Sequence, residues 1–216
     1  MNKKNISVQL ITLGCDKNTV DSEYLIKQLF INGVNVITDD NINKCDVVVI
    51  NTCGFKNDAK EQSINTILKC VKAKQKKLVS KIYVVGCLSQ LYAEELKKEI
   101  PEVDGFMGID YIKSILSELE CNYYNNYSHE RILTTPSHYA YLKIAEGCNR
   151  MCSFCVIPLI KGKYISKSMG VILKEAEVLA DKGVKELILI AQETTYYGVD
   201  IYGERKLKIL IEELTK

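Results

Sequence analysis

The sequence EGCNRMCSFCVIP at residues 146–158 decides how the rest of the chain is interpreted, because Cys148, Cys152 and Cys155 share one short loop. Their spacing is C-x-x-x-C-x-x-C, and thiolates so close together can converge on one soft metal centre such as an iron–sulfur cluster. Three ligands rather than four leave one coordination position of the centre open. The loop is therefore expected to hold a metal centre at which a substrate can bind.

The residues around this loop predict the opening of a parallel (β/α) barrel. Residues 139–145 (YAYLKIA) are typical of a strand, and the cysteine loop follows at its C-terminal end. Periodic apolar residues predict helices over 168–182 and 206–216, with a buried type of strand between them at 186–191 (ELILIA). Active sites of such barrels lie at the C-terminal ends of the strands. Two strand–helix units cannot close a barrel, so residues 139–216 are expected to form an incomplete one.

The chain before residue 122 predicts a separate domain in which strands and helices alternate. Such alternation is typical of an open parallel α/β sheet with right-handed crossovers. The expected strands are 7–12, 34–38, 46–51, 81–85 and 103–107, and the expected helices are 18–32, 57–76, 89–99 and 111–120. Residues 122–138 are polar, contain both histidines of the chain and indicate a linker. The predicted organisation is an α/β domain at 1–121, a linker at 122–138 and the partial barrel at 139–216.

Three more cysteines follow predicted strands of the first domain. Cys15, Cys53 and Cys87 each come after the C-terminal end of a strand, and these ends form one rim of a parallel sheet, where ligands bind. Each adjoins a glycine, which lets the backbone come close to a bulky cluster. From the pattern alone, metal ligation and a role as small buried apolar residues both stay open for these three. The cysteines at 45, 70 and 121 have no such placement and are expected to be buried apolar residues.

Composition argues against several classes of protein. The nine cysteines are an odd number in a chain of 216 residues, which favours metal ligation in a reducing compartment over a disulfide framework. No apolar run approaches the roughly 18 residues of a membrane span, and the apolar region near the N-terminus is too short for a lipoprotein signal. A formal charge of +2 gives no case for general nucleic-acid binding, and the lysines within 69–81 are expected to form a solvated helix face. These features predict a cytoplasmic protein without direct membrane or nucleic-acid contacts.

The cysteine loop resembles the signature of radical S-adenosylmethionine (SAM) enzymes. Further segments resemble the methylthiotransferases of that group over nearly the whole chain, namely LGCDKNTVDSE (13–23), NTCGFKNDAKEQSI (51–64), GCLSQLY (86–92) and YAYLKIAEGCNRMCSFCVIP (139–158). The segment AQETTYYGVDIYG (191–203) is more similar to the branch that modifies an aspartate on protein twelve of the small ribosomal subunit than to the tRNA-adenosine branch.

The resemblance implies two [4Fe–4S] clusters and SAM as cofactors. The ligands of the SAM-binding cluster would be Cys148, Cys152 and Cys155. The ligands of an auxiliary, sulfur-delivering cluster would be Cys15, Cys53 and Cys87. Phe154 would lie against the adenine of SAM, and Gln192 would bind the same molecule.

The resemblance also implies a reaction and its partners. An electron from the first cluster would cleave SAM to methionine and a deoxyadenosyl radical, which abstracts hydrogen from the aspartate β-carbon. Sulfur methylated by a second SAM would then be transferred from the auxiliary cluster to that carbon. The implied partners are the ribosomal protein and an electron donor such as a flavodoxin or ferredoxin.

The chain departs from the family pattern at three places. Asp16 stands where proline is common, and Lys161 stands where arginine is usual, which keeps the charge but loses bidentate recognition. The sequence ends at Lys216, before the rest of the barrel and a small β-domain, so the chain is expected to lack independent activity. Two other functions stay open. They are methylthiolation of a tRNA adenosine, and a non-enzymatic metal-binding or redox module built on Cys152 and Cys155.

Overall fold

The computed structural model describes residues 6–39, 41–127 and 129–216, which fall into two compact units, Met1–Ile132 and Leu133–Lys216. The division lies within the range 122–138 that the sequence predicts to be a linker. In the described part of the chain, no helix has both the length and the apolar character needed to cross a lipid bilayer. Each unit packs around hydrophobic clusters of its own.

Unit 1 is built on a sheet in which neighbouring strands run parallel. The strand order is β2-β1-β3-β4-β5. The strands are β1 (Ser7–Thr12), β2 (Asn35–Ile37), β3 (Cys45–Thr52), β4 (Val79–Gly86) and β5 (Gly105–Phe106). The strands β3 and β4 are buried over most of their length, as expected when helices cover both faces of a sheet. The predicted open parallel α/β sheet is confirmed.

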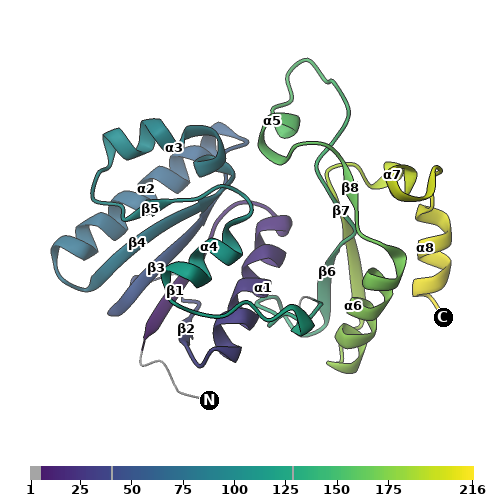
Figure 1. Ribbon diagram of the computed structural model, residues 1–216, viewed down its shortest axis with the longest axis horizontal. Helices are drawn as coiled ribbons and strands as arrows, with labels where there is room; N and C mark the ends of the chain where they lie inside the picture. The colour runs from purple at the N-terminus through teal and green to yellow at the C-terminus, as the bar shows by residue number, and fades with distance from the viewer. Residues whose placement is uncertain (1–5, 40, 128) are drawn as a thin grey trace. The chain divides into compact units, whose positions relative to one another are not determined.

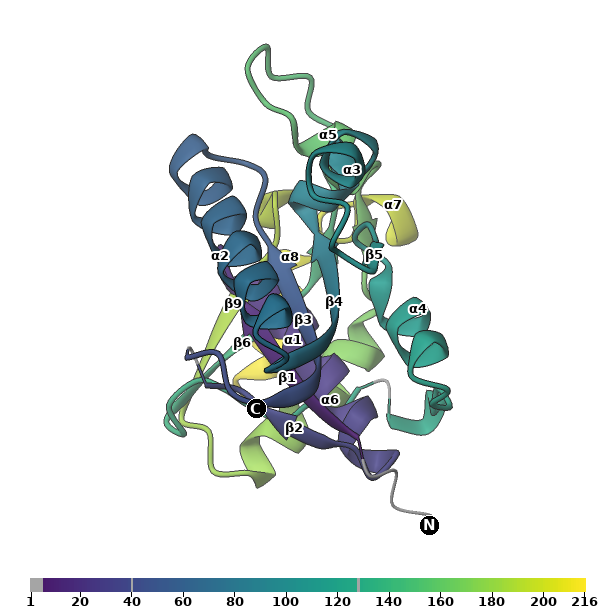
Figure 2. The same ribbon diagram turned by 90° about the vertical axis from the view of Figure 1, so that its left-hand side faces the viewer.

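Helices cover both faces of this sheet (Figures 1 and 2). On one face lie α2 (Asn57–Gln75) and α3 (Cys87–Glu99), which share a hydrophobic cluster with the even-numbered residues of β3 from 48 to 50. On the other face lie α1 (Asp16–Ile31) and α4 (Tyr111–Glu118), which share a second cluster with residues 47 and 49 of the same strand. Alternate residues of β3 therefore belong to opposite cores, as the period of two in a strand requires.

The chain changes direction across the sheet between β1 and β3. It leaves β1 into α1 on one face, and it leaves β3 into α2 on the other. Strand pairing ends nearly level here, with Thr12 opposite Asn51 and Thr52 opposite Gly86. The C-terminal ends of β1 and β3 thus form a topological switch point, which is where open α/β sheets bind ligands.

The segment after α4 runs back along α1 and includes a short 3-10 helix, η1 (Asn125–Tyr127). Gln28 forms two hydrogen bonds with the backbone of Tyr124, at 3.0 and 2.9 Å. The Arg131 guanidinium forms an ion pair with Glu23 in which both side chains are almost fully buried. This part of the predicted linker range therefore packs as part of unit 1.

Unit 2 contains two small sheets. The strands β6 (Tyr139–Lys143) and β9 (Glu186–Ile190) pair in parallel, and β7 (Ala145–Glu146) and β8 (Ile165–Ser166) pair antiparallel. The helices are α5 (Ile157–Lys161), α6 (Met169–Asp181), η2 (Thr194–Tyr196), α7 (Val199–Tyr202) and α8 (Leu207–Leu214). The succession of β6, α6, β9 and α8 confirms the predicted opening of a (β/α) barrel (Figure 1).

Candidate functional site

Three cysteines of unit 1 follow neighbouring strands at the C-terminal edge of the sheet, and we call Cys15, Cys53 and Cys87 the cysteine rim. Cys15 is the N-cap of α1, Cys53 follows the last residue of β3, and Cys87 is the first residue of α3. The strands that lead to them are adjacent in the sheet. None of the three described residues forms a disulfide bond, and Cys15 is exposed while the other two are buried. The fold therefore places the predicted auxiliary ligands at one edge of the sheet.

Two glycines bring the loops of the cysteine rim into close contact. A Cβ atom at Gly14, whose φ is +96°, would lie 2.4 Å from the Cβ of Cys53. A Cβ atom at Gly54 would lie 2.9 Å from the Cα of Leu88 and 3.0 Å from the carbonyl carbon of Cys87. The sequence predicts that these glycines make room for a cluster. In the structure they make room for the neighbouring cysteine loop, which no other residue type would allow without a shift.

The second cysteine set lies on the loop between β7 and α5, which is fixed at its base. The amide of Cys148 donates to the carbonyl of Gly162 at 3.2 Å. The side-chain oxygen of Asn149 accepts a hydrogen bond from the amide of Tyr164 at 2.9 Å. Because β7 and β8 pair on either side of these bonds, both ends of the loop are held together.

The tip of the cysteine loop is exposed. The amide of Cys155 donates to the carbonyl of Cys152 at 3.1 Å, which closes a tight turn. Within this turn Phe154 is 88% exposed, and Met151 just before the turn is 92% exposed. The ring of Phe154 is thus available to stack on a planar ligand, and its assignment to adenine stays a prediction.

Arg150 connects the cysteine loop to the segment after β9. Its Nε lies 2.5 Å from a carboxylate oxygen of Glu193. The same carboxylate accepts hydrogen bonds from the amide and the hydroxyl of Thr195, at 3.2 and 2.5 Å. The hydrogen bonds from Thr195 and the charge of Arg150 lower the pKa of Glu193. Glu193, which directly follows Gln192, is therefore ionised and connects the cysteine loop to the segment after β9.

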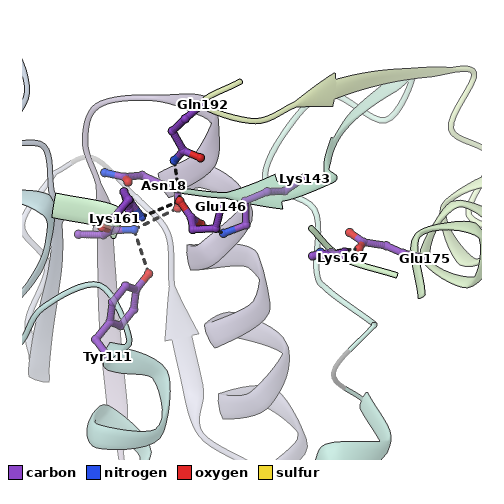
Figure 3. A network of polar contacts seen from close by, with 9 residues as sticks. Asn18, Tyr111, Lys143, Glu146, Lys161, Lys167, Glu175 and Gln192 are labelled. Atoms are coloured by element: carbon purple, nitrogen blue, oxygen red, sulfur yellow. Dashed lines mark hydrogen bonds and ion pairs between the residues drawn. The ribbon is translucent and has the colours of Figure 1, made fainter. Parts of the chain in front are cut away.

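Glu146 is the centre of a polar network under the cysteine loop (Figure 3). One carboxylate oxygen lies 2.7 Å from the ammonium of Lys143, at the end of β6. The other accepts a hydrogen bond from the side-chain nitrogen of Gln192 at 2.6 Å and lies 3.3 Å from the ammonium of Lys161. The network thereby joins the two parallel strands to both ends of the cysteine loop.

The charges of this network favour an ionised Glu146. Burial alone would raise the pKa of the Glu146 carboxyl, but the Lys143 and Lys161 ammoniums and the hydrogen bonds bring it down to about 2. An ionised carboxylate only accepts hydrogen bonds, so Gln192 must present its nitrogen to Glu146. The side-chain oxygen of Gln192 is buried and has no hydrogen-bond partner among the described residues. Gln192 therefore has a buried acceptor that no described protein group uses.

We expect Glu146→Gln to lower the free energy of unfolding of unit 2 by about 2 kcal/mol, because the buried ammoniums of Lys143 and Lys161 lose this carboxylate. Urea denaturation followed by circular dichroism measures the effect. Glu204→Gln is the control, since the Glu204 side chain is 67% exposed in its contact with Lys206 and its loss should leave the midpoint unchanged. Equal midpoints for the two variants would contradict a stabilising role for the network.

The two cysteine sets suit iron–sulfur clusters in the chemistry of their donors. Thiolates are the usual ligands of such clusters, and each set offers three cysteines that follow the ends of strands. Within the described residues, no group of three or more histidine, cysteine, aspartate or glutamate side chains is arranged to hold a metal ion. The ligands of a cluster bind different irons, so they need not converge on one point as the ligands of a single ion do.

The other three cysteines of unit 1 do not belong to the cysteine rim. Cys45 and Cys70 are buried in the hydrophobic cluster under α2 and α3, and Cys121 is partly buried. Burial, with a smaller effect of Cys45, raises the pKa of the Cys70 thiol to about 12. A thiol of this kind behaves as a small apolar residue.

Several residues of these sites were not singled out from the sequence. Glu146 and Lys143 belong to a segment that looks apolar as a whole, and only the two charges within it could have indicated a buried network. Asn18 and Asn51 are nearly fully buried beside the cysteine rim. In the sequence, only their positions close to Cys15 and Cys53 could have indicated a role for these two asparagines at the rim.

Both units match known protein families. Residues 7–108 match the family described as "Uncharacterized protein family UPF0004", and residues 142–215 match the radical SAM superfamily. In known structures, the fold is similar to that of TsrM, a radical SAM methyltransferase from Kitasatospora setae, with a TM-score of 0.63, 13% identity, and coverage of 97% of this chain and 50% of that one. It is also similar to the cobalamin-dependent SAM radical enzyme OxsB, with a TM-score of 0.59, 12% identity, and coverage of 97% and 36%. At these identities the likeness shows the fold alone.

Curated relatives are more similar. The ribosomal protein uS12 methylthiotransferase RimO of Cytophaga hutchinsonii is 51% identical over 208 residues, which are 96% of this chain and 48% of the relative. The RimO of Christiangramia forsetii is 52% identical over 214 residues, which are 99% of this chain and 47% of the relative. The chain thus spans about half the length of the curated relatives it matches. The chain therefore combines a UPF0004 domain with a radical SAM domain and is a homologue of the N-terminal half of the RimO methylthiotransferases.

Proposed function

We propose that this protein methylthiolates the β-carbon of an aspartate in ribosomal protein uS12. The observation that carries the proposal is the presence of two sets of three cysteines, one in each domain, each set directly after the C-terminal ends of strands. The relatives that are about half identical to this chain bear the name of this activity. The identity supports a uS12 substrate over a tRNA adenosine.

In the proposed site the cysteine loop holds a [4Fe–4S] cluster, which when bound supplies the electron that cleaves SAM. The residues around the loop bind and orient SAM. Gln192 accepts a hydrogen bond from SAM through its buried side-chain oxygen, and Glu146 keeps the amide turned that way. Phe154 covers the adenine with its exposed ring. Lys161 holds the far end of the loop on Glu146.

In this proposal the cysteine rim binds the second cluster, and that cluster is the source of the transferred sulfur. An electron donor such as a flavodoxin or ferredoxin would reduce the first cluster. The nine free cysteines favour a reducing compartment, and we place the protein in the cytoplasm. Unit 1 would take part in the reaction by supplying the three thiolate ligands of this cluster.

The test is mass spectrometry of the two candidate substrates. The chain is loaded anaerobically with iron and sulfide, and incubated with SAM, a reductant and either small ribosomal subunits or tRNA. The full-length relative of Cytophaga hutchinsonii, treated in the same way, is the reference for a complete enzyme. We expect both proteins to cleave SAM and to add one methylthio group to uS12.

Modification of tRNA in place of uS12 would assign the protein to the other branch. Zinc in place of iron and sulfide after anaerobic purification, without SAM cleavage, would instead identify a non-enzymatic metal-binding module. Either result overturns the proposed function.

A further inference from the structure

Asn18, in the first turn of α1, forms a bridge between two loops of the cysteine rim. Its side-chain nitrogen donates to the carbonyl of Leu13 at 2.8 Å and to the carbonyl of Thr52 at 3.2 Å. Leu13 lies two residues before Cys15, and Thr52 lies directly before Cys53. One amide group thus donates one hydrogen bond to the segment that leads to Cys15 and another to the segment that leads to Cys53.

This bridge lies where the regular pairing of the sheet stops. The pairing of β1 with β3 ends at Thr12 and Asn51, and one more backbone bond follows from the Leu13 amide to the Asn51 carbonyl at 2.8 Å. Beyond it the two loops turn to opposite faces of the sheet. A Cβ atom at Gly14 would lie 3.3 Å from the Asn18 side-chain nitrogen, so the bridge is next to the close approach of Gly14 to Cys53.

Asn51 fixes the bridging residue in turn. Its side-chain nitrogen lies within hydrogen-bond distance of the Asn18 carbonyl at 3.0 Å, the Ser22 hydroxyl at 3.0 Å and the Tyr111 hydroxyl at 2.9 Å. Asn18 and Asn51 are each 1% exposed. Buried amides are costly unless they are hydrogen-bonded, so a pair of asparagines in this core needs a specific reason.

We infer that Asn18 is a positioning residue that sets the spacing of Cys15 and Cys53, so that the cysteine rim can accept an iron–sulfur cluster. The inference rests on the proposed role of the rim as the second cluster site. Within the described residues, the Asn18 side chain donates its hydrogen bonds to backbone carbonyls and not to either sulfur atom. The amide acts on the loop backbones, which leaves the sulfur atoms available to iron. Without it, the two loops keep their strands but lose the link that holds their ends together.

The test compares Asn18→Leu with Gln28→Met in the full chain. Gln28 is a matched control, because it lies on the same helix, is 2% exposed and also forms two hydrogen bonds with backbone groups, but away from the rim. Each variant is loaded anaerobically, and its iron and sulfide content, its electron paramagnetic resonance spectrum and its rate of iron loss to a chelator are measured. We expect Asn18→Leu to fall from about two clusters toward about one, and Gln28→Met to keep both.

Urea denaturation separates positioning from a general loss of stability. If Gln28→Met lowers the unfolding midpoint as much as Asn18→Leu does and still keeps both clusters, a purely structural role is excluded. If Asn18→Leu does not fold, Asn18→Ser replaces it, since a hydroxyl retains one of the two donated bonds. Full loading with unchanged iron release in the folded Asn18 variant overturns the inference.

A third variant keeps this result distinct from the proposed function. Replacing all three rim cysteines by alanine should remove one cluster. If this variant keeps all its iron, the rim does not bind a cluster, and the assignment of the second cluster to the rim in the proposed function is wrong. If it loses one cluster while the Asn18 variants lose none, only the positioning role is wrong.

Discussion

The triple substitution of Cys148, Cys152 and Cys155 by alanine is expected to reduce the iron and sulfide content from about two clusters to about one, and to abolish SAM cleavage. The loop that carries these thiols is held by its own base and by the Glu146 network, and the Cys148 sulfur adds one long hydrogen bond, from the Arg150 amide at 3.4 Å. The variant should therefore fold with the cysteine rim intact. Chemical analysis of iron and sulfide after anaerobic loading measures the first effect, and chromatography of deoxyadenosine measures the second.

The matched control for this prediction is the triple substitution of the remaining cysteines. The control replaces Cys45, Cys70 and Cys121 by alanine, which also removes three thiols but none from either set. It should keep both clusters and lose only the packing of small buried groups. Iron content that is unchanged in the first variant, or reduced equally in both, would refute the assignment of the cysteine loop.

Arg131→Met is expected to lower the free energy of unfolding of unit 1 by about 3 to 5 kcal/mol. The side chains of Arg131 and Glu23 are 1% and 0% exposed, so the substitution leaves the Glu23 carboxylate buried without its guanidinium partner. Adding Glu23→Leu to the same chain should recover most of the loss, because the pair is then replaced by apolar groups. Urea denaturation of the metal-free protein by circular dichroism is the suitable measurement, since the chain has no tryptophan.

The neighbouring ion pair of Lys27 and Glu130 provides the comparison. It has a distance of 2.7 Å, but its side chains are 18% and 26% exposed. Glu130→Gln should therefore change the stability by no more than about 1 kcal/mol. A double variant of Arg131 and Glu23 that is no more stable than Arg131→Met would show that the stabilisation comes from packing of the arginine stem and not from the charge pair.

The fold could be predicted because its signals are long and regular. The continuous apolar run of β3 requires cover on both faces, and each strand is followed by a helix, which together define an open parallel sheet. The short elements carry too few residues for a period to appear. β7 and β8 have two residues each and α5 has five, and none was expected from the sequence.

The first residues of the two helices at the cysteine rim show a second reason why sequence-based prediction was wrong in detail. Helices were expected at residues 18 and 89, but α1 begins at Asp16 and α3 at Cys87. Neither has a serine, threonine, asparagine or aspartate cap with a side-chain bond, and these are the residues on which prediction of a helix start depends. Gly86, whose φ of +93° only glycine adopts readily, stands at the cap position before α3.

The candidate sites could be predicted only as far as their residue types have a characteristic spacing. Both cysteine sets are recognisable as thiols after strands, and the fold places each set at a strand end. The supporting groups have no such spacing. Gln192 and Glu146 are 46 positions apart, and Asn18 and Thr52 are 34 positions apart, so their contacts depend on strand pairing that the sequence alone does not specify.

The early starts of α1 and α3 also have an electrostatic consequence. The N-terminus of a helix carries a partial positive charge, and Cys15 is the N-cap of α1 while Cys87 is the first residue of α3. These two helices pack on opposite faces of the sheet, and yet both direct their positive ends to the same rim. Negative charge that gathers there, as on thiolates or an anionic cluster, is therefore stabilised by the backbone dipole of α1 on one side and by that of the short first segment of α3, which ends at a kink at Tyr92, on the other.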